Sequence, residues 1–319
     1  MIMAVTPAFG PLTPAAEIAA AFPDAIQGKN IIVTGVSSGS LGLATAEAFA
    51  SQSPANPIVT GRSVEKVHAA ISHLKSKYPN VHYHALIMDL ASQSSVRAAA
   101  ARINNDDSIL TIDILVNNAV VMAIPTLTLS EDGTETTFAT NHLGHFLFTN
   151  LILPKMILAA SQTLSTRSSS SAPTTRIVNA FSPTRSPRRQ ISCTRSIALN
   201  QRLGAEYGIA SFAVHPVAVD TQINRHASPS EIQQALKRVA ELGLDSTPKT
   251  PEQGANSSVL AAVDSILPPV DATKVEVRGV YIADCKVDDE NVAAFAKNRG
   301  FADRLWNLSE ELVKQKLEL

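Results

Sequence analysis

The chain has few cysteines, which folds held together by disulfide bonds or by structural zinc require. Its 319 residues include two cysteines, Cys193 and Cys285, which lie far apart and form no CxxC pair. Neither a disulfide framework nor a zinc site is therefore indicated, and a reducing, cytoplasmic compartment fits best. The formal net charge of −1 gives no global electrostatic case for binding nucleic acid or an anionic membrane.

A long uncharged apolar run is also missing. No stretch approaches the roughly eighteen such residues that crossing a bilayer needs, so no membrane span is expected. Residues 15–22 are apolar but short, and no basic residue precedes them, which favours a packing helix over a signal peptide. We expect an N-terminal extension over residues 1–27 and a single domain over residues 28–319, because this length suits one large α/β domain.

A strand, turn and helix pattern near the N-terminus predicts a dinucleotide site. Residues 30–33 are mostly β-branched, three glycines follow, and residues 43–50 favour a helix. Gly35 would let the chain turn, Gly39 would let the backbone approach a pyrophosphate, and Gly42 would let the helix pack on the sheet. The phosphates would then bind the unpaired N–H groups at the amino end of that helix. The alternative is a tight turn that binds nothing.

The residue after the second expected strand indicates which dinucleotide binds. Residues 56–60 read as a strand, and Gly61 and Arg62 follow it. An acidic residue at this place hydrogen-bonds the ribose of NAD, whereas an arginine accommodates the 2′-phosphate of NADP. Because a guanidinium matches a phosphate with two charged hydrogen bonds, Arg62 favours NADP. The alternative is an ordinary solvated arginine.

Several motifs resemble those of the short-chain dehydrogenase/reductase family. Residues 34–42 read Thr-Gly-x-x-x-Gly-x-x-Gly, which is the family's TGxxxGxG with one more residue between the last two glycines. Residues 132–150 match its DGxExxFxTNHLGHFLLT helix almost letter for letter and indicate the branch of retinol-dehydrogenase-like and WW-domain-oxidoreductase-like members. Residues 117–120 resemble its NNAG, and residues 176–182 its RIVNVSS. The resemblance implies an α/β Rossmann fold, a doubly wound parallel sheet.

The resemblance also implies site residues. Asp89 would accept from the adenine amino group, and Ser182 would hydrogen-bond the substrate oxygen. Asn141 would hold a water of a proton relay at a local break in its helix. Together, the motifs and the resemblance assign to the NADP site Gly35, Ser38, Gly39, Leu41, Gly42, Arg62, Asp89, Asn118, Ala119, Val219 and Thr221.

The histidines do not indicate a metal site. His82 and His84 share one face of a third strand expected over residues 81–88, but no third ligand lies near, so we expect them to be solvated. His142 and His145 are expected to pack or to cap a helix. Trp306 is expected to be a packing anchor of a terminal helix over residues 302–312, with a dimer surface as the alternative.

The Tyr-x-x-x-Lys pair of the family does not occur. Reduction of a carbonyl needs a proton donor, and a tyrosine becomes acidic enough only beside a lysine ammonium and the positively charged nicotinamide. The chain's tyrosines all lie elsewhere, at Tyr78, Tyr83, Tyr207 and Tyr281. No alignment register therefore restores the motif.

Other residues stand where the pair should be. In the family, the lysine precedes a His-Pro pair by a nearly fixed number of residues. That spacing, counted back from the His-Pro at 215–216, places the lysine at Arg189 or Gln190 and the tyrosine at Arg185 or Ser186. Counting forward from Ser182 places the tyrosine at Arg195. An arginine cannot replace the tyrosine as acid, because it holds its proton too tightly. The segment 183–190 is basic and broken by prolines, so we expect a solvated loop there.

Further departures lie nearby. The family's glycines after Asn-Asn-Ala and after His-Pro are Val120 and Val217 here. Residues 161–175 are rich in serine and cannot bury a face, so a loop or disordered insertion is expected. Residues 224–243 would form the substrate lid.

The sequence therefore predicts an NADP(H)-dependent oxidoreductase acting on a carbonyl or secondary alcohol of a small apolar metabolite, in specialised metabolism. The alternative is a catalytically inactive NADP-binding protein or scaffold. A deduced sequence that lost an exon or changed frame between Ser182 and Leu199 would also explain the missing pair. A small-molecule substrate is expected, without nucleic acid, metal or membrane, and a homo-oligomer is left open.

Overall fold

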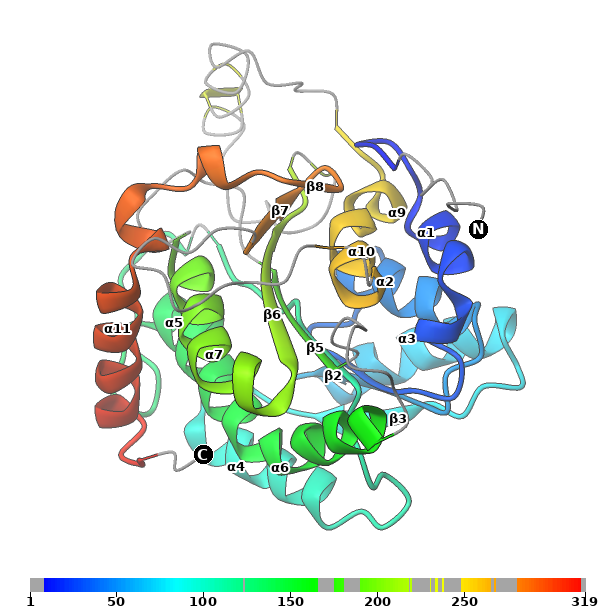
Figure 1. Cartoon of the computed structure of the whole chain (residues 1–319), viewed down its shortest axis with the longest axis horizontal. Coiled ribbons are helices and arrows are strands. Elements are labelled where there is room, and N and C mark those ends of the chain that lie inside the picture. The colour runs from blue at the N-terminus through cyan, green and yellow to red at the C-terminus, as the bar shows by residue number, and fades with distance from the viewer. Residues whose placement is uncertain are drawn as a thin grey trace.

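A computed structural model describes residues 9–122, 124–165, 175–180, 190–217, 248–264 and 280–316, with positions 219, 230, 233–234, 237 and 267. Within these residues the chain forms one eight-stranded sheet with the order β3-β2-β1-β4-β5-β6-β7-β8 (Figure 1). The first seven strands in that order pair in parallel, and β8 pairs antiparallel with β7. The predicted doubly wound parallel sheet is confirmed.

The strands form where short apolar runs bury both faces of the sheet, as parallel strands do. Ile32 is fully buried and pairs with Ile58 on one side and Leu115 on the other. The strand order reverses at β1, and ligands of such sheets bind outside the carboxyl ends of the strands at this point. The strands are β1 (Asn30–Val33), β2 (Asn56–Gly61), β3 (His84–Ile87), β4 (Ile114–Asn117), β5 (Thr175–Ala180), β6 (Ile209–His215), β7 (Tyr281–Ala283) and β8 (Lys286–Val287).

Helices cover both faces of the sheet (Figure 1). On one face of the sheet, a hydrophobic core lies between the strands and the helices α4 (Gln93–Asn104), α6 (Gly144–Ser165), α7 (Gln190–Tyr207) and α11 (Arg299–Leu312). A second core joins the other face to α1 (Ala15–Ala21), α2 (Leu41–Ala50), α3 (Val64–Lys77) and α10 (Asn256–Val263). Shorter elements are η1 (Pro23–Ala25), α5 (Thr136–Phe138), the π-helix η2 (Ala139–Leu143), α9 (Pro251–Gly254), η5 (Asp289–Asn291) and η6 (Ala294–Lys297).

Side-chain caps explain where several helices begin. Ser40, Ser63 and Ser92 each accept a hydrogen bond from the backbone N–H three residues on, at the starts of α2, α3 and α4. Thr250 forms a capping box with Gln253 at the start of α9. The helix expected over residues 43–50 is confirmed and begins two residues earlier, at Leu41.

Three expectations were wrong in part. The third strand covers residues 84–87 rather than 81–88, because the chain still turns after Tyr78, whose carbonyl accepts from the Val81 N–H. Residues 161–165 belong to α6 rather than to a serine-rich loop, and the Ser161 hydroxyl donates to the Leu158 carbonyl of the same helix. Thr175 already opens β5. Residues 166–174 lie outside the described residues.

The C-terminal part also differs in detail from the expectation. Helix α7 begins at Gln190, where a loop was expected, and residues 183–189 are not described. The last parallel strand is followed by β8, which the sequence did not indicate. Helix α11 begins at Arg299, three residues earlier than expected, because the Asn298 side chain accepts from the Phe301 N–H. Residues 224–243, the predicted lid, are almost entirely outside the described residues.

Two apolar helical segments lie against the protein interior. As expected, α1 packs into the protein, and its Ile18 and Ala19 are fully buried in the second core. The expectation that no stretch is long and apolar enough to cross a membrane was wrong, because the helical segment 136–162 meets this test by length and composition; 72% of its apolar window is buried inside the protein. Burial of this kind is what the core helix of a folded domain also shows.

Candidate functional site

The turn between β1 and α2 admits only glycine at two positions. Gly35 has φ +72°, and a Cβ placed there would lie 2.6 Å from the Cα of Ala119. A Cβ on Gly42 would lie 2.6 Å from the Nδ2 of Asn118 and 2.7 Å from the carbonyl oxygen of Gly35. The turn is therefore pressed against the end of β4, at the point where the strand order reverses.

The amino end of α2 is open to an anion. Ser40 caps the helix, and its Oγ accepts from the N–H groups of Leu43 and Ser37, both at 3.1 Å. The extra residue between the last two glycines is accommodated here, with Gly39 at φ +68° before the cap. In the described part of the chain, no acceptor binds the N–H groups of Ser38, Gly39, Leu41 and Gly42. Free N–H groups at the start of a helix favour the binding of an anion such as phosphate.

Buried hydrogen bonds fix this turn to the end of β4. The Oγ1 of Thr34 accepts from the N–H groups of Asn118 at 2.9 Å and Ala119 at 3.0 Å. The Asn118 side chain donates to the Thr34 carbonyl at 2.8 Å. Asn118 and Ala119, both predicted to border the cofactor, are thus held beside Gly35.

His145 extends this network to the helix layer. Its Nε2 lies 2.9 Å from the Oγ1 of Thr34, and its Nδ1 lies 3.4 Å from the carbonyl oxygen of Asn141. Because the Thr34 oxygen already accepts twice, its O–H donates to Nε2, which leaves the proton of the ring on Nδ1. Burial, and secondly the charge of Arg195, lower the pKa of His145 to about 3. The imidazole is therefore neutral at pH 7.

Asn141 lies in the π-helix η2, so the helix break implied by the resemblance is present. Its Oδ1 accepts from the Val121 N–H at 2.8 Å, and its Nδ2 donates to the Val121 carbonyl at 2.9 Å. The side chain therefore clamps the segment that follows Asn118 and Ala119. Its backbone carbonyl faces the helix layer and accepts from His145 and Arg195.

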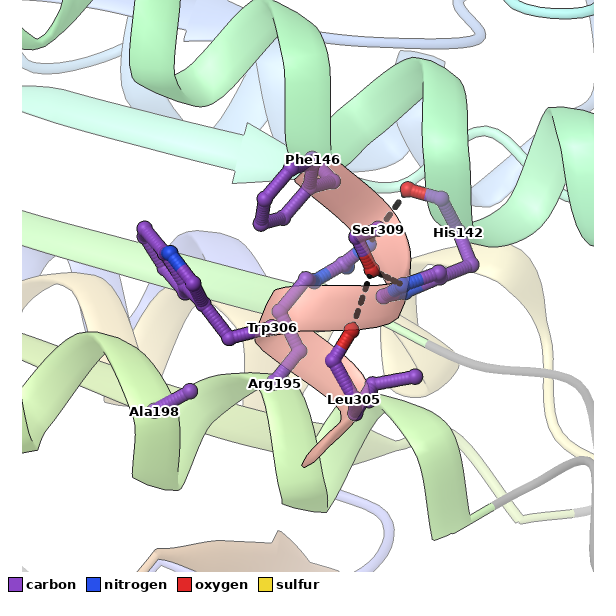
Figure 2. A pocket seen from close by; sticks show the side chains of 7 residues that line it. All are labelled: His142, Phe146, Arg195, Ala198, Leu305, Trp306 and Ser309. Atoms are coloured by element: carbon purple, nitrogen blue, oxygen red, sulfur yellow. Dashed lines mark hydrogen bonds between the residues drawn. The ribbon is translucent and has the colours of Figure 1, made fainter. Parts of the chain in front are cut away.

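Arg195 is buried on α7, and one alignment register places the missing tyrosine there. Its Nη1 lies 3.3 Å from the carbonyl oxygen of His142 and its Nη2 lies 2.8 Å from the Oδ1 of Asn179. Figure 2 shows Arg195 enclosed with His142 of the π-helix and with Trp306 of α11. At 2% exposure, the guanidinium is sealed from solvent. Trp306 packs edge-on against Phe146, as a packing anchor would.

Arg62 and Asp89 follow neighbouring strands. Arg62 comes directly after β2 and is exposed, and no ion pair to it is found among the described residues. Asp89 follows β3, and its Oδ1 accepts from the Ala91 N–H at 2.9 Å. Both stand at the carboxyl edge of the sheet, as predicted.

Val217 stands where the family has glycine, and its backbone adopts a conformation that glycine favours. Its φ is +62°, a left-handed conformation that is strained for a β-branched residue. Its N–H donates to the Nδ1 of His215 at 2.9 Å, and its side chain packs against a cluster that includes Cys193 and Tyr281. Val120, the other replacement, is half-buried.

The remaining predicted cofactor residues lie partly outside the described residues. Val219 pairs with Lys249 in an isolated parallel bridge. A Cβ on Gly254 would lie 2.5 Å from a Val219 methyl and 2.7 Å from a Leu41 methyl, so Leu41 and Val219 converge on Gly254. Ser182 and Thr221 lie outside the described residues.

The histidines agree in part with the expectation. His142 and His145 are buried packing residues, and His142 bonds the Ser309 hydroxyl at 2.8 Å. His82 is exposed, whereas His84 is half-buried and bonds Asn56 at 2.9 Å rather than being solvated. In the described parts of the chain, no group of three histidine, cysteine or acidic side chains could hold a metal ion.

Comparison with known proteins identifies the family. A family model described as short chain dehydrogenase matches residues 29–232. The chain belongs to this family. It is 33% identical to human retinol dehydrogenase 13 over 301 residues, which cover 90% of this chain and 85% of that one. It is 42% identical to oxidoreductase fscI of Fusarium equiseti over 148 residues, which cover 46% of this chain and 57% of the relative.

Solved structures agree on the fold. A short chain dehydrogenase from Burkholderia cenocepacia, in complex with NADP, superposes with a TM-score of 0.59 at 22% identity, over 81% of this chain and 96% of that one. The family consists of oxidoreductases that use nicotinamide cofactors, and this chain is accordingly an oxidoreductase of the short chain dehydrogenase type. The two glycines that exclude a Cβ and the open N–H groups of α2 fit such a cofactor.

Proposed function

We propose that the protein binds NADP(H) across the carboxyl ends of β1, β2 and β4. The observation that carries this proposal is the open amino end of α2, with an exposed arginine, Arg62, at the end of the neighbouring strand. The pyrophosphate would lie on the N–H groups of Ser38, Gly39, Leu41 and Gly42, and Arg62 would bind the 2′-phosphate.

The rest of the cofactor would follow the sheet. Asp89 would meet the adenine, and Asn118 and Ala119 would border the ribose beside Gly35. Val219 and Thr221 would meet the nicotinamide. The NADP complex of the Burkholderia relative, which has the same fold, supports this placement.

The reaction proposed is the interconversion of a carbonyl and a secondary alcohol in a small apolar metabolite, as part of specialised metabolism in the cytoplasm. When bound, NADPH supplies a hydride for the carbonyl carbon. Ser182 would orient the carbonyl oxygen, and Asn141 would support proton delivery from the π-helix. The free cysteines Cys193 and Cys285 are consistent with a reducing compartment.

A second function has its own support. No tyrosine is followed four residues later by lysine, and Arg195, which one register places at the tyrosine site, is buried and cannot serve as an acid. This favours an NADP-binding protein without turnover. A homo-oligomer is compatible with either function.

Two measurements on the purified protein separate these proposals. A fluorescence titration with NADPH measures binding, and a panel of carbonyl substrates then measures turnover. Binding with turnover supports the oxidoreductase, and binding without turnover supports the inactive NADP-binding protein. Absence of NADPH binding at millimolar concentration contradicts both. Sequencing of the transcript across residues 182–199 tests whether the segment is the native one.

A further inference from the structure

Arg195 is a buried cation that the proposed reaction does not use. No carboxylate forms an ion pair with it within the described part of the chain, and its partners are neutral oxygens. Burying a charge is unfavourable unless polar groups replace its water. Burial also lowers the pKa of Arg195 to about 9, so the guanidinium remains charged at pH 7. The contacts that hold it are therefore strong constraints on its neighbours.

Two of these contacts are made to the π-helix. Nη1 of Arg195 lies 3.4 Å from the carbonyl oxygen of Asn141 and 3.3 Å from that of His142. A π-helical turn departs from the regular hydrogen-bond ladder of an α-helix, and in this turn two successive carbonyls face the guanidinium. Figure 2 shows the bond to His142 from within the helix layer. The guanidinium thus binds two successive carbonyl groups of η2.

The π-helix in turn holds the segment that borders the predicted cofactor. The side-chain amide of Asn141 bonds both backbone groups of Val121, at 2.8 and 2.9 Å. Through its carbonyl, Asn141 also meets His145, which bonds Thr34 and so reaches Asn118 and Ala119. Both routes begin at the residue whose carbonyl Arg195 binds.

The other nitrogen of the guanidinium, Nη2, belongs to a hydrogen-bond network that links β4 and β5. Nη2 donates to the Oδ1 of Asn179 at 2.8 Å, and the same oxygen accepts from the Nδ2 of Asn117 at 3.0 Å. Asn117 ends β4, and Asn179 lies one residue before the end of β5. One fork of donors therefore joins η2, β4 and β5.

We propose that Arg195 is a positioning residue that holds the nicotinamide end of the cofactor site by fixing the π-helix carbonyls and, through Asn141, the backbone at Val121. The proposal rests on the proposed binding of NADP(H). A purely structural role would weaken the binding of the whole cofactor when Arg195 is replaced. The proposal predicts instead that the nicotinamide half is bound more weakly and that the adenine half is bound as before.

The test compares Arg195→Met and Arg195→Lys with the wild type in two titrations. NADPH contacts both halves of the site, whereas 2′,5′-ADP contacts only the adenine half near Arg62. Arg195→Met is expected to weaken NADPH binding by about tenfold and to leave 2′,5′-ADP binding unchanged. Arg195→Lys keeps the charge but not the fork, so it is expected to restore part of the loss.

Arg202→Met is the matched control, because Arg202 lies on the same helix and stacks on Trp306 at 4.2 Å without touching η2. It is expected to bind NADPH as the wild type does. Equal weakening of both ligands in the Arg195 variants, or no weakening of either, overturns the proposal. If Arg195→Met does not fold, the same comparison with Arg195→Lys decides.

Amide hydrogen exchange gives a readout that does not need the cofactor. The Val121 amide is expected to exchange faster in the Arg195 variants and at the wild-type rate in Arg202→Met. If the wild type binds neither nucleotide, the proposed function fails, and exchange at Val121 alone then judges the role of Arg195. Unchanged exchange at Val121 in a folded Arg195 variant contradicts it.

Discussion

The two sides of the predicted cofactor crevice are built differently. On the β1 to β4 side, Gly35 and Gly42 stand where a Cβ would clash, and the Oγ1 of Thr34 accepts hydrogen bonds from Asn118 and Ala119. On the β5 to β6 side, Val217 has a left-handed backbone conformation, and the arginine Arg195 is buried without a carboxylate partner among the described residues. The side that would bind phosphate is thus intact, whereas the side that would carry chemistry has been altered.

This difference separates binding from turnover. Phosphate binding depends on backbone N–H groups and on an exposed guanidinium, which need little else from the fold. Proton delivery needs a specific acid beside a specific cation. The first requirement can survive changes that remove the second, so binding and catalysis have to be measured separately in this protein.

The largest effect is expected from Gly42→Val, which disturbs the turn between β1 and α2 on the phosphate side. The new Cβ would lie 2.6 Å from the Asn118 side chain and 2.7 Å from the Gly35 carbonyl, so the turn must move. We expect a loss of about 3 kcal/mol in the free energy of unfolding and a loss of at least about 100-fold in NADPH affinity. Urea denaturation and fluorescence titration measure the two effects.

Gly10→Val is the matched control, because nothing lies within 4 Å of a Cβ at Gly10 and its φ is not in the left-handed region. It is expected to change stability by less than about 0.5 kcal/mol. Wild-type NADPH affinity in Gly42→Val would contradict the close packing of the turn.

The helices η2 and α6, which contact both sides, can be probed by pH. Burial, followed by the charge of Arg195, lowers the pKa values of His142 and His145 from the ordinary 6.5. Above pH 6.5 both rings are neutral whether folded or unfolded. Below it the unfolded chain binds protons that the folded chain refuses, so stability falls as the pH falls towards 3, by about 1.4 kcal/mol per pH unit for each histidine.

Denaturation in urea at several pH values between 7.5 and 5 tests this expectation. His145→Gln should remove one histidine's share of the slope, whereas His68→Gln should leave the slope as it is, since His68 is exposed on α3. If the slopes of wild type and His145→Gln coincide, the buried neutral state of His145 is contradicted.

The smallest effect is expected at Val217. Glycine removes the strain of φ +62° but loses packing and adds freedom to the unfolded chain. Because these terms oppose each other, Val217→Gly should change the free energy of unfolding by no more than about 1 kcal/mol. Val214→Gly, at a fully buried position of β6, should cost about 3 kcal/mol or more. Equal costs at the two positions would show that Val217 is not strained.

Local signals explain what the sequence could predict. The glycines of the first turn and the arginine after β2 act within a few residues of their own position. The β-branched runs mark the parallel strands for the same reason. The amino-acid sequence alone therefore predicts these parts of the phosphate side.

Long-range contacts explain what it could not predict. His145 meets Thr34 from 111 residues away, and Arg195 meets Asn141 from 54 residues away. No local pattern distinguishes a buried arginine from a solvated one, so the sequence indicates Arg195 only as a substitute for tyrosine. Helix α7 likewise begins at Gln190, in a segment expected to be a loop, because its burial against β6 and α11 outweighs weak local preference.

The most direct test of the central claim is calorimetric titration of the wild type and of Arg62→Met with NADPH and with NADH. The account predicts that the wild type binds NADPH at least about tenfold more tightly than NADH, and that Arg62→Met loses this preference while its NADH affinity stays the same. A wild type that binds both nucleotides equally, or an unchanged preference in Arg62→Met, would contradict it.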